Sequence, residues 1–449
     1  MQRLVVIGGD AAGMSAASKV RRMQPERAIS VFERGSYTSY AACGIPYFVA
    51  GLVEDKDRLI ARTPQEFREK YRIEAMMRHE VLAIYPDEQR ILVRDLEKKE
   101  ERREAYDQLL IATGAQPVTT GFDGENCANV HLVNTLVHAE ALDKALAGGK
   151  VQRVVIAGGG YIGLEMAEAL LMRGVEVTMI HRGKEVMATF DPDMGSHVSE
   201  ALRQSGIRLQ LNTSLEGFVQ EQGRVSAVLT SQGKMPTDMV VLGIGVKPAS
   251  RLAREAGIGL GPKDSVRVNE LQETDHANIW AAGDCASSFH LVSRRPVYIA
   301  LGTIANRQGR IAGINIGGGY ATFPGLLGTS IAKFMECECS RTGLHERELK
   351  QLGWQYVQAQ ITANTRPRYY PGTSPIHVKI LAEKGSGNLL GVQIVGGPGS
   401  AKRIDTAAMA LNAGLRVDEL INVDLSYAPP FSGVWDPIVT AAKQVMKKV

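Results

Sequence analysis

Two glycine-rich loops in this sequence are placed to hold phosphate groups. In the first, the apolar run 4–7 leads into Gly8 and Gly13, and a second apolar run ends at Glu33, about 20 residues beyond Gly13. Glycines at this spacing allow a tight turn and let the N-terminus of the following helix approach a pyrophosphate. An acid at that distance can hydrogen-bond an adenosine ribose.

The second loop carries the complete pattern, with Gly158, Gly160 and Gly163 at the three glycine positions. The apolar run 154–157 precedes it, and a helical stretch and a further strand, 175–180, follow it. One such motif is weak evidence by itself. Two copies, each between a strand and a helix, indicate that the chain binds two dinucleotides.

Two departures from the usual pattern affect these sites. Asp10 occupies the middle-glycine position of the first loop, where a carboxylate disfavours a pyrophosphate unless its side chain turns away. After the strand that follows the second loop, where NAD-specific proteins carry an acid, the chain has His181 and Arg182. An arginine suits the 2′-phosphate of NADPH, and the alternative is a solvated loop charge.

Cys43 is the cysteine best placed for chemistry. It stands directly before Gly44, Ile45 and Pro46, where a helix start or a neighbouring cofactor would lower the pKa of its thiol and favour the reactive thiolate. A buried structural thiol is the alternative. The position five residues later is Phe48, so no partner for an internal disulfide lies close by. We interpret the remaining cysteines as structural: Cys127, Cys285, Cys337 and Cys339.

Short apolar strands must position these residues. The runs 109–115 and 240–245 predict a strand in each half that ends in small residues and marks a crossing between domains. The run 279–284 predicts another strand, which ends in Gly-Asp. From about residue 325 the pattern changes to alternating stretches followed by a helical run, which predicts a separate α+β domain.

Composition excludes several classes of protein. The 449 residues suffice for roughly two to four domains, and 44% hydrophobic with 22% charged residues is typical of a globular chain. A net charge of +4 is too dilute for nucleic-acid binding, and no apolar run could span a membrane. Five cysteines without a Cys-x-x-Cys pair give no zinc site. Because the N-terminus lacks a signal-peptide pattern, we expect a cytoplasmic protein without nucleic-acid, membrane or metal partners.

These motifs resemble those of the FAD- and NAD(P)H-dependent pyridine nucleotide-disulfide oxidoreductases over essentially the whole chain. Besides the two loops, the resemblance rests on the strand end at 112–114, the segment 274–284 and the tail motif 426–432. A lone Cys43 resembles the single-cysteine branch of that family. Peroxidases and oxidases of this branch carry a histidine where this chain has Ala11, so the coenzyme A disulfide reductases are the most similar group.

The resemblance implies an α/β fold with two Rossmann-like dinucleotide-binding domains and a C-terminal α+β dimerisation domain. FAD would bind residues 1–115 and 247–324, NADPH or NADH would bind 116–246, and 325–449 would form a homodimer. The implied cofactor-binding residues are Gly8, Ala11, Ala12, Gly13, Glu33, Arg34, Thr113, Gly114, Gly158, Gly160, Tyr161, Ile162, Gly163, Glu165, His181, Arg182, Gly245, Gly283 and Asp284.

The implied reaction passes hydride from the nicotinamide to FAD and then to a mixed disulfide between Cys43 and coenzyme A. Tyr369 and Tyr427 of the partner subunit would supply phenols to this site, although Tyr370 competes with Tyr369 for the role, and a core tyrosine is the alternative for each. Glu165 is either a neighbour of the nicotinamide or an ordinary first-turn carboxylate. The implied coenzyme A ligands, for which ordinary surface positions are nearly as good an explanation, are Lys19, Arg22, Ser39, Asn306 and Arg307.

Polysulfide or a persulfide could replace coenzyme A disulfide and use the same cysteine. A water-forming NADH oxidase is the enzymatic rival, since reduced flavin can react with oxygen without the missing histidine. A flavin-bearing electron-transfer or interaction protein is a rival of another class, and the presence of Cys43 argues against it.

Overall fold

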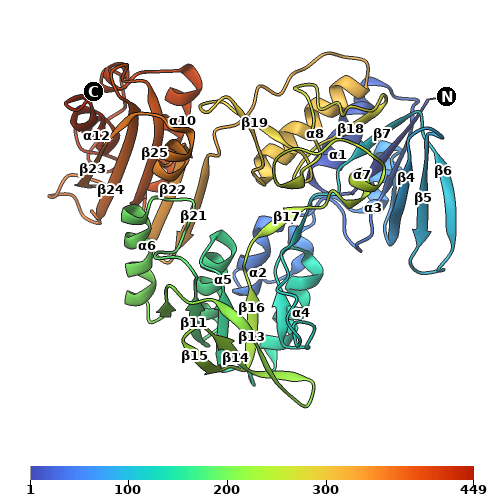
Figure 1. Cartoon of the computed structure of the whole chain (residues 1–449), viewed down its shortest axis with the longest axis horizontal. Helices are drawn as coiled ribbons and strands as arrows, with labels where there is room; N and C mark the ends of the chain where they lie inside the picture. Colours follow the sequence, from blue (N-terminus) through green and yellow to red (C-terminus); the bar gives the residue numbers. More distant parts are fainter. Residues whose placement is uncertain (1) are drawn as a thin grey trace.

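The computed structural model describes residues 2–449, and its first sheet carries the first glycine loop (Figure 1). Five parallel strands lie in the order β18-β7-β1-β2-β3. Their bounds are Arg3–Ile7 (β1), Ala28–Phe32 (β2), Glu74–Met76 (β3), Gln108–Ile111 (β7) and Ile279–Ala281 (β18). β1 is central, and its residues 4–7 are apolar and buried, so the loop that follows it opens at the middle of the sheet edge.

Helices α1 (Ala11–Met23) and α8 (Gly302–Ile316) pack closely against each other beside this sheet. Small residues make the contact possible. A Cβ atom at Gly309 would lie 2.3 Å from the Ala12 carbonyl oxygen, and one at Gly313 would lie 2.7 Å from that of Ala16. The pair therefore brings residues from the two ends of the unit's sequence together. Helix α3 (Pro64–Tyr71) begins with a capping box between Thr63 and Glu66.

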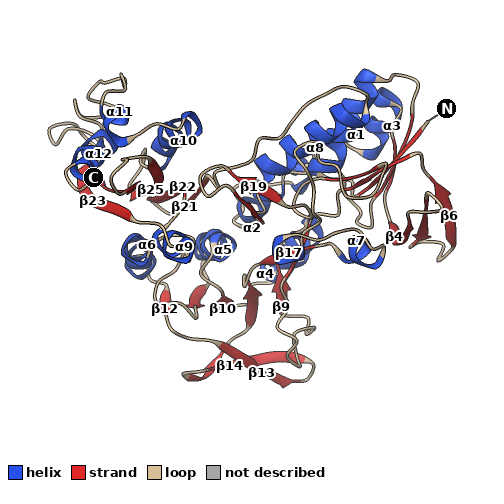
Figure 2. Cartoon of the chain, turned by 45° about the horizontal axis from the view of Figure 1, so that its top comes forward, coloured by secondary structure: helices blue, strands red, loops and turns tan. Residues whose placement is uncertain are grey.

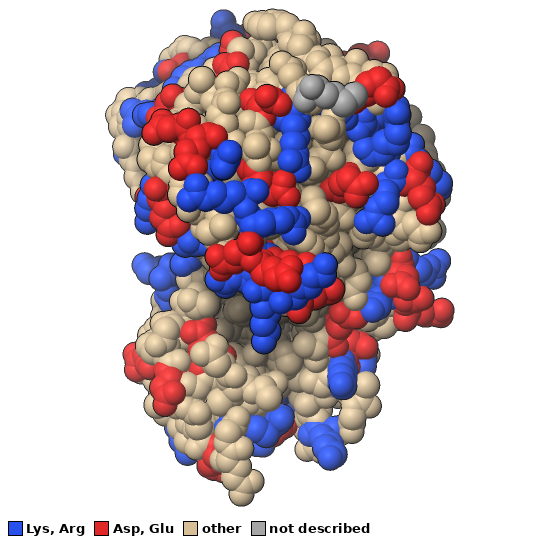
Figure 3. Space-filling view, turned by 90° about the vertical axis from the view of Figure 1, so that its right-hand side faces the viewer, with Lys and Arg blue, Asp and Glu red and all other residues tan. Residues whose placement is uncertain are grey.

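An antiparallel sheet of β4 (His79–Tyr85), β5 (Arg90–Asp95) and β6 (Glu101–Ala105) forms the outer side of this unit. Figure 3 shows this side, where Lys and Arg side chains alternate with Asp and Glu. Arg94 pairs with Glu101 at 2.5 Å and Arg103 pairs with Glu88 at 2.7 Å, all four side chains being exposed. Such pairs add little stability, and they leave no large patch of one sign on this face.

The second sheet carries the second glycine loop and is also parallel, in the order β12-β11-β10-β16-β9. Its strands are β9 (Val130–Leu132), β10 (Arg153–Ala157), β11 (Glu176–Ile180), β12 (Arg208–Gln210) and β16 (Met239–Leu242). Its helices are α4 (Leu136–Ala147), α5 (Tyr161–Met172) and α6 (Pro192–Gln204). A three-stranded antiparallel sheet is added by β13 (Leu215–Glu221), β14 (Arg224–Thr230) and β15 (Gly233–Pro236).

The chain passes between these two units through one pair of short strands. β8 (Ala115–Pro117) pairs antiparallel with β17 (Val246–Pro248), directly after the two runs that mark crossings in the sequence. Smaller elements nearby are α2 (Ile45–Val49), α7 (Arg251–Glu255), β19 (Ser288–His290), β20 (Arg295–Val297) and the 3-10 helices Ala42–Gly44, Lys56–Leu59 and Pro262–Asp264.

The C-terminal part is an antiparallel sheet with helices, in the strand order β21-β22-β25-β24-β23. The strands are β21 (Ser330–Phe334), β22 (Cys337–Gly343), β23 (Tyr356–Asn364), β24 (Pro375–Glu383) and β25 (Leu389–Gly396). The helices are α9 (Glu346–Leu352), the 3-10 turn Ala401–Arg403, α10 (Ile404–Ala413), α11 (Val417–Ile421) and α12 (Pro437–Met446). The predicted fold class, two parallel α/β units followed by an α+β unit, is confirmed.

A buried lysine anchors the C-terminal sheet to the second unit, where α5, α6 and α9 lie between the two sheets (Figure 2). Lys379 is fully buried, and its ammonium lies 3.1 Å from Asp191, 2.7 Å from Asp193 and 2.5 Å from Glu346. Gln393 adds hydrogen bonds of 2.8 and 2.7 Å to Asp191. Three carboxylates therefore hold one cation at this junction, which satisfies a charge that burial alone would make costly. Among the described residues, no helix combines the length and the apolar character that crossing a membrane would require.

Candidate active site

The glycines of the first loop are required by close backbone packing. Gly8 has a φ of +107°, and a Cβ there would lie 2.1 Å from the Ala112 carbonyl oxygen. A Cβ at Gly13 would lie 2.0 Å from the carbonyl oxygen of Gly8, so helix and strand can touch only without side chains. Glu33 closes the loop by accepting hydrogen bonds from the amides of Gly9 at 2.8 Å and Gly35 at 2.7 Å.

The second loop repeats this construction with one informative change. Gly158 has a φ of +114°, and a Cβ at Gly163 would lie 1.9 Å from its carbonyl oxygen. In place of an acid, His181 accepts the amide hydrogen of Gly159 through Nδ1 at 3.1 Å. Burial and the neighbouring Arg182 lower the pKa of His181, so its ring is neutral. His181 therefore holds the loop, and the exposed Arg182 is the cation that faces solvent.

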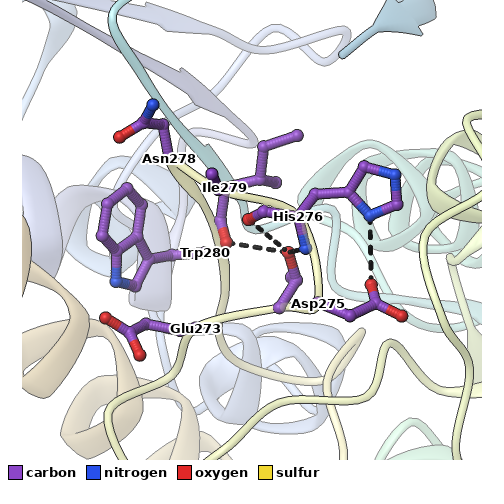
Figure 4. A pocket seen from close by; sticks show the side chains of 8 residues that line it. Glu273, Asp275, His276, Asn278, Ile279 and Trp280 are labelled. Atoms are coloured by element: carbon purple, nitrogen blue, oxygen red, sulfur yellow. Dashed lines mark hydrogen bonds and ion pairs between the residues drawn. The ribbon is translucent and has the colours of Figure 1, made fainter. Parts of the chain in front are cut away.

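A turn before β18 positions Gly283 and Asp284, and Figure 4 shows it from close by. The Thr274 hydroxyl donates to the Ile279 carbonyl at 2.9 Å and accepts from the His276 amide at 3.2 Å. A cavity of about 260 Å³ is lined by residues 273–280 of this turn, and none of the predicted site residues lines it. The threonine of the predicted segment therefore acts by shaping the strand entry.

Gln308 on α8 fixes the loop after β18, a role the sequence did not reveal. Its side-chain oxygen accepts the amide hydrogen of Gly283 at 2.9 Å, and its nitrogen donates to Ser287 and Ser288. A Cβ at Gly283 would lie 2.8 Å from that of Ala12 on α1. No motif marks Gln308, because only the packing of α8 brings it to this loop.

Cys43 lies in the 3-10 helix Ala42–Gly44, one residue before the N-cap of α2, and is exposed. Partial burial of its sulfur raises the pKa of the thiol, and the carboxylates of Glu165, Asp284 and Asp10 raise it further. The predicted lowering of this pKa is therefore wrong for the polypeptide by itself. The charged groups acting on the sulfur are carboxylates, and α2 is too short to supply a strong helix dipole.

Glu165 on α5 faces the same thiol from the second unit. Burial, and then the nearby Glu168, raise its pKa to about 7. Tyr47 on α2 joins this group. Burial raises the pKa of its phenol, and Glu165, Glu168 and Cys43 raise it further. Glu168 itself pairs with Lys333 of β21 at 2.5 Å. Cys43 thus lies between the carboxylates of both nucleotide-binding units, and Tyr47 is a site residue that the sequence motifs did not indicate.

The remaining predicted residues of the two cofactor sites serve mainly as links between units. Tyr161 reaches the C-terminal unit, where its hydroxyl bonds to Ser330 at 2.5 Å, and the neighbouring Ile162 is half-buried against the apolar core. The Thr113 hydroxyl donates to the Ala249 carbonyl at 2.7 Å across the β8–β17 crossing. The other members are Gly114 and Gly245, which have φ of +67° and +117°, Ala11, which opens α1, and the exposed Arg34.

Tyr369 and Tyr427 lie together in the C-terminal unit and are 74% and 47% exposed. The phenol of Tyr427 acts on that of Tyr369 and raises the pKa of Tyr369. Tyr370 turns away and lies under the guanidinium of Arg366, 5.8 Å from its ring centre. Neither paired tyrosine is among the groups that act on Cys43 of the same chain.

The predicted coenzyme A ligands lie on two adjacent helices and one loop. Lys19 and Arg22 are on α1, and Asn306 and Arg307 are on α8, with Asn306 bonded to Ser15 of α1 at 2.9 Å. Arg22, Asn306 and Arg307 are exposed, and Lys19 is half-buried. Ser39 lies apart from them, in the segment before Cys43. The α1–α8 pair therefore brings four of the five residues onto neighbouring helices.

Comparison with known proteins identifies the family. The model of pyridine nucleotide-disulphide oxidoreductases matches residues 2–309, and the model of that family's dimerisation domain matches residues 329–437. This chain belongs to the pyridine nucleotide-disulphide oxidoreductases. It is an enzyme of that family, and its cofactors are FAD and NAD(P)H.

Members of this family with similar sequences differ in their named activities. The NAD(P)H coenzyme A polysulfide/persulfide reductase of Pyrococcus horikoshii is 40% identical over 98% of each chain. The NADH oxidase of Methanocaldococcus jannaschii is 33% identical over 100% of this chain and 99% of its own. The solved structure of reduced Bacillus anthracis CoADR-RHD superposes with a TM-score of 0.96 at 33% identity, covering 99% of this chain and 80% of that one.

The residues of the first unit fit the FAD of this family. Gly8, Gly13 and Gly283 allow β1, α1 and the loop after β18 to pack against one another without intervening side chains, and such a close strand–turn–helix packing is part of a dinucleotide site. Asp10 would oppose the diphosphate, but its carboxylate is turned to the Tyr40 amide, at 3.2 Å. Burial also raises the pKa of Asp10 to about 6, which reduces its charge near neutrality. The carboxylate therefore does not exclude the cofactor.

Proposed function

We propose that this oxidoreductase reduces coenzyme A disulfide, or a coenzyme A persulfide or polysulfide, with NAD(P)H and uses Cys43 as its only redox cysteine. The observation that carries the proposal is the place of Cys43. It is an exposed thiol that lies among Asp284 and Asp10 of the first unit and Glu165 of the second. The coenzyme A chemistry named for the relative from Pyrococcus horikoshii supports the substrate class.

In the proposed reaction the Cys43 thiolate attacks one sulfur of the disulfide. A Cys43–coenzyme A disulfide forms and the other coenzyme A leaves as a thiolate, which takes up one proton. FAD held by the first unit would supply the route by which two electrons from NAD(P)H reach this mixed disulfide. Its S–S bond then breaks, which regenerates the Cys43 thiolate and releases the second coenzyme A. One disulfide, one NAD(P)H and one further proton thus give two thiols and NAD(P)⁺.

Side chains of the protein would donate protons and bind the coenzyme A phosphates in this reaction. The paired phenols of Tyr369 and Tyr427 would donate to the leaving thiolate of the partner subunit's site, which requires a homodimer. Lys19, Arg22, Asn306 and Arg307 would face the coenzyme A phosphates from the α1–α8 pair. In this proposal FAD occupies residues 1–115 and 247–324, NAD(P)H occupies 116–246, and 325–449 forms the dimer. A cytoplasmic location stays a prediction.

The deciding experiment compares wild type with Cys43→Ser and, as a matched control, Cys127→Ser, which changes a partly exposed cysteine elsewhere. We expect Cys43→Ser to retain FAD, seen by its absorbance, and to lose NADPH-dependent coenzyme A disulfide reduction by at least about 10³-fold. Wild-type protein treated with coenzyme A disulfide should gain the mass of one coenzyme A at Cys43. Retained disulfide turnover in Cys43→Ser would contradict the single-cysteine mechanism.

A water-forming NADH oxidase is the second candidate, and the relative from Methanocaldococcus jannaschii favours it. Ala11 opens α1 at the position where the oxidases of this branch carry histidine, so no imidazole is available there to handle protons. The assay that separates the two candidates measures NADH and NADPH consumption with oxygen alone and then with coenzyme A disulfide under argon. Turnover confined to oxygen would assign the oxidase.

A further inference from the structure

Asp10, directly before α1, is an unusual N-cap residue. It stands in the N-cap position of α1, where an aspartate side chain commonly accepts a hydrogen bond from its own helix, yet it makes no such side-chain cap. Its backbone needs no glycine, because its φ is −115°. In the second loop the corresponding residue is Gly160, where a Cβ would meet nothing within 4 Å. A side chain therefore fits at this position, and the question is what Asp10 does there.

The carboxylate of Asp10 reaches the segment that carries the redox cysteine. Its Oδ1 accepts the amide hydrogen of Tyr40 at 3.2 Å, between residues far apart in sequence. The adjacent Gly9 carbonyl accepts from the Ser39 amide at 3.1 Å and from the Thr38 hydroxyl. Two consecutive residues of the glycine loop thus bind three consecutive residues of this segment.

The other side of the same segment is also fixed. The Ala61 amide donates to the Ser39 carbonyl and the Ala41 amide donates to the Leu59 carbonyl, both at 2.8 Å. Ser39 has a φ of +51°, a conformation that needs such support. Cys43 follows within one turn of this clamped backbone. Asp10 is the one ionisable side chain among these clamping contacts, and its charge also acts on the sulfur.

We propose that Asp10 is a positioning residue for Cys43, one that holds the redox segment through the Tyr40 amide and brings a carboxylate to the surroundings of the thiol. This inference rests on the proposed function only in taking Cys43 as the reacting thiol. The aspartate at the middle-glycine position then serves the disulfide site and does not impair the FAD site.

The charged groups around Asp10 and Cys43 decide whether Asp10 raises or lowers the pKa of the thiol. Glu33 after β2 and Asp284 after β18 face Asp10 and, after burial, help to raise its pKa to about 6. Glu165 on α5, Asp284 and Asp10 face Cys43, and the Tyr40 phenol also lies near Asp10. Once ionised, Asp10 disfavours the thiolate, so removing its charge must lower the pKa of Cys43.

The negative charge of Asp10 near the Cys43 thiol has a chemical use. A thiolate of higher pKa is intrinsically more nucleophilic, and attack on a disulfide is fastest when the pKa of the thiol lies near the ambient pH. A flavin or a coenzyme A site that stabilises the thiolate lowers this pKa, whereas Asp10 opposes the shift. Asp10 therefore keeps the pKa of Cys43 from falling so far that the thiolate loses nucleophilicity.

The test measures alkylation of Cys43 by iodoacetamide against pH in the reduced holoenzyme, read by peptide mass spectrometry. Asp10→Asn keeps an acceptor for the Tyr40 amide and removes the charge. We expect the midpoint to fall by about half a pH unit or more. Asp55→Asn, a matched change at an exposed residue that does not act on Cys43, should leave the midpoint in place.

A second variant separates positioning from charge. Asp10→Gly restores the motif and gives the loop the residue that its counterpart carries at Gly160, so the fold has a precedent in the same chain. It should lower the midpoint as Asp10→Asn does and, in addition, speed hydrogen exchange at the Tyr40 amide, which Asp10→Asn leaves protected. An unchanged midpoint in both variants would overturn the proposal. Because this readout needs no turnover, failure of the Cys43→Ser experiment would be a separate result that concerns the proposed function alone.

Discussion

Glu33 and His181 close the two glycine loops in the same way, each by accepting an amide hydrogen from the residue after the first glycine. Their charges differ, however. A carboxylate at this position repels a 2′-phosphate, whereas the pKa of His181 is lowered and the ring stays neutral. Arg182 next to it is exposed and can meet the extra phosphate of NADPH.

We therefore expect Arg182→Ala to raise the KM for NADPH by about tenfold or more, because a charge-assisted hydrogen bond contributes about 1.5–3 kcal/mol. The KM for NADH should change little. Arg224→Ala, an exposed arginine on β14 of the same unit, serves as the control. Steady-state assays with both nucleotides measure the effect, and equal changes for NADPH and NADH would refute this assignment.

At the scale of elements, the glycines of the second loop have two separable tasks. Gly163 lets α5 touch β10, since a Cβ there would lie 1.9 Å from the Gly158 carbonyl oxygen. Gly160 faces open space and has an ordinary negative φ of −91°. Gly163 is needed by the packing of α5 on β10. Nothing within the protein requires glycine at position 160, so we expect Gly160 to serve the nucleotide.

Gly163→Ala should therefore destabilise the protein by about 1–3 kcal/mol, because the backbone must shift to admit the methyl group. Gly160→Ala should leave the melting temperature near that of wild type and weaken NADPH binding. Thermal unfolding and NADPH titration of both variants provide the comparison. A loss of stability in Gly160→Ala equal to that in Gly163→Ala would contradict the separation of these two roles.

The junction between α6 and the C-terminal sheet depends on Lys379. Replacing it with methionine leaves Asp191 buried beside Asp193 and Glu346 without their cation, which should cost about 3–5 kcal/mol. Lys350→Met is the control, because Lys350 also pairs with Glu346, at 3.3 Å, but is 67% exposed. Chemical denaturation measures both, and a Lys379→Met loss below that of Lys350→Met would contradict the assigned role.

At the scale of the whole molecule, apolar side chains gather on the surface of the C-terminal unit near the tyrosine pair. Phe431 is 74% exposed, Val434 is 69% exposed and Trp435 is 62% exposed, all on the loop that also carries Tyr427. Exposed apolar surface of this kind marks an interface. A closed two-fold dimer would cover it and carry the tyrosines of each subunit to the Cys43 of the other.

A mixing experiment tests this arrangement. Cys43→Ser subunits and Tyr369→Phe/Tyr427→Phe subunits should each reduce disulfide poorly, the second because the leaving thiolate lacks a proton donor. Random exchange forms heterodimers with one intact composite site of two, so each heterodimer should have about half of wild-type activity. Because about half of the dimers in an equal mixture are heterodimers, the activity of the mixture should rise toward about a quarter of wild type. Exchange is verified by native mass spectrometry. If activity stays at the level of the separate variants despite exchange, the tyrosines act within their own subunit or not at all.

The sequence by itself determined the two glycine-rich loops and the order of α/β and α+β units, and it set Cys43 apart from the other cysteines. These features are local, since the turn conformations of Gly8 and Gly158 and the alternation of strand residues are properties of short segments. A helix start suggested a low pKa for Cys43. This expectation failed because partial burial raises the pKa of the thiol, and carboxylates from elsewhere in the chain raise it further.

Tertiary structure alone decided which groups meet. It brought Glu165 of one unit and Asp284 of another to Cys43, paired Tyr369 rather than Tyr370 with Tyr427, and turned Asp10 to the Tyr40 amide. These pairs lie far apart in the chain and share no periodicity that a pattern could reveal. Their distances depend on how helices and sheets pack, and electrostatic effects on a thiol follow those distances.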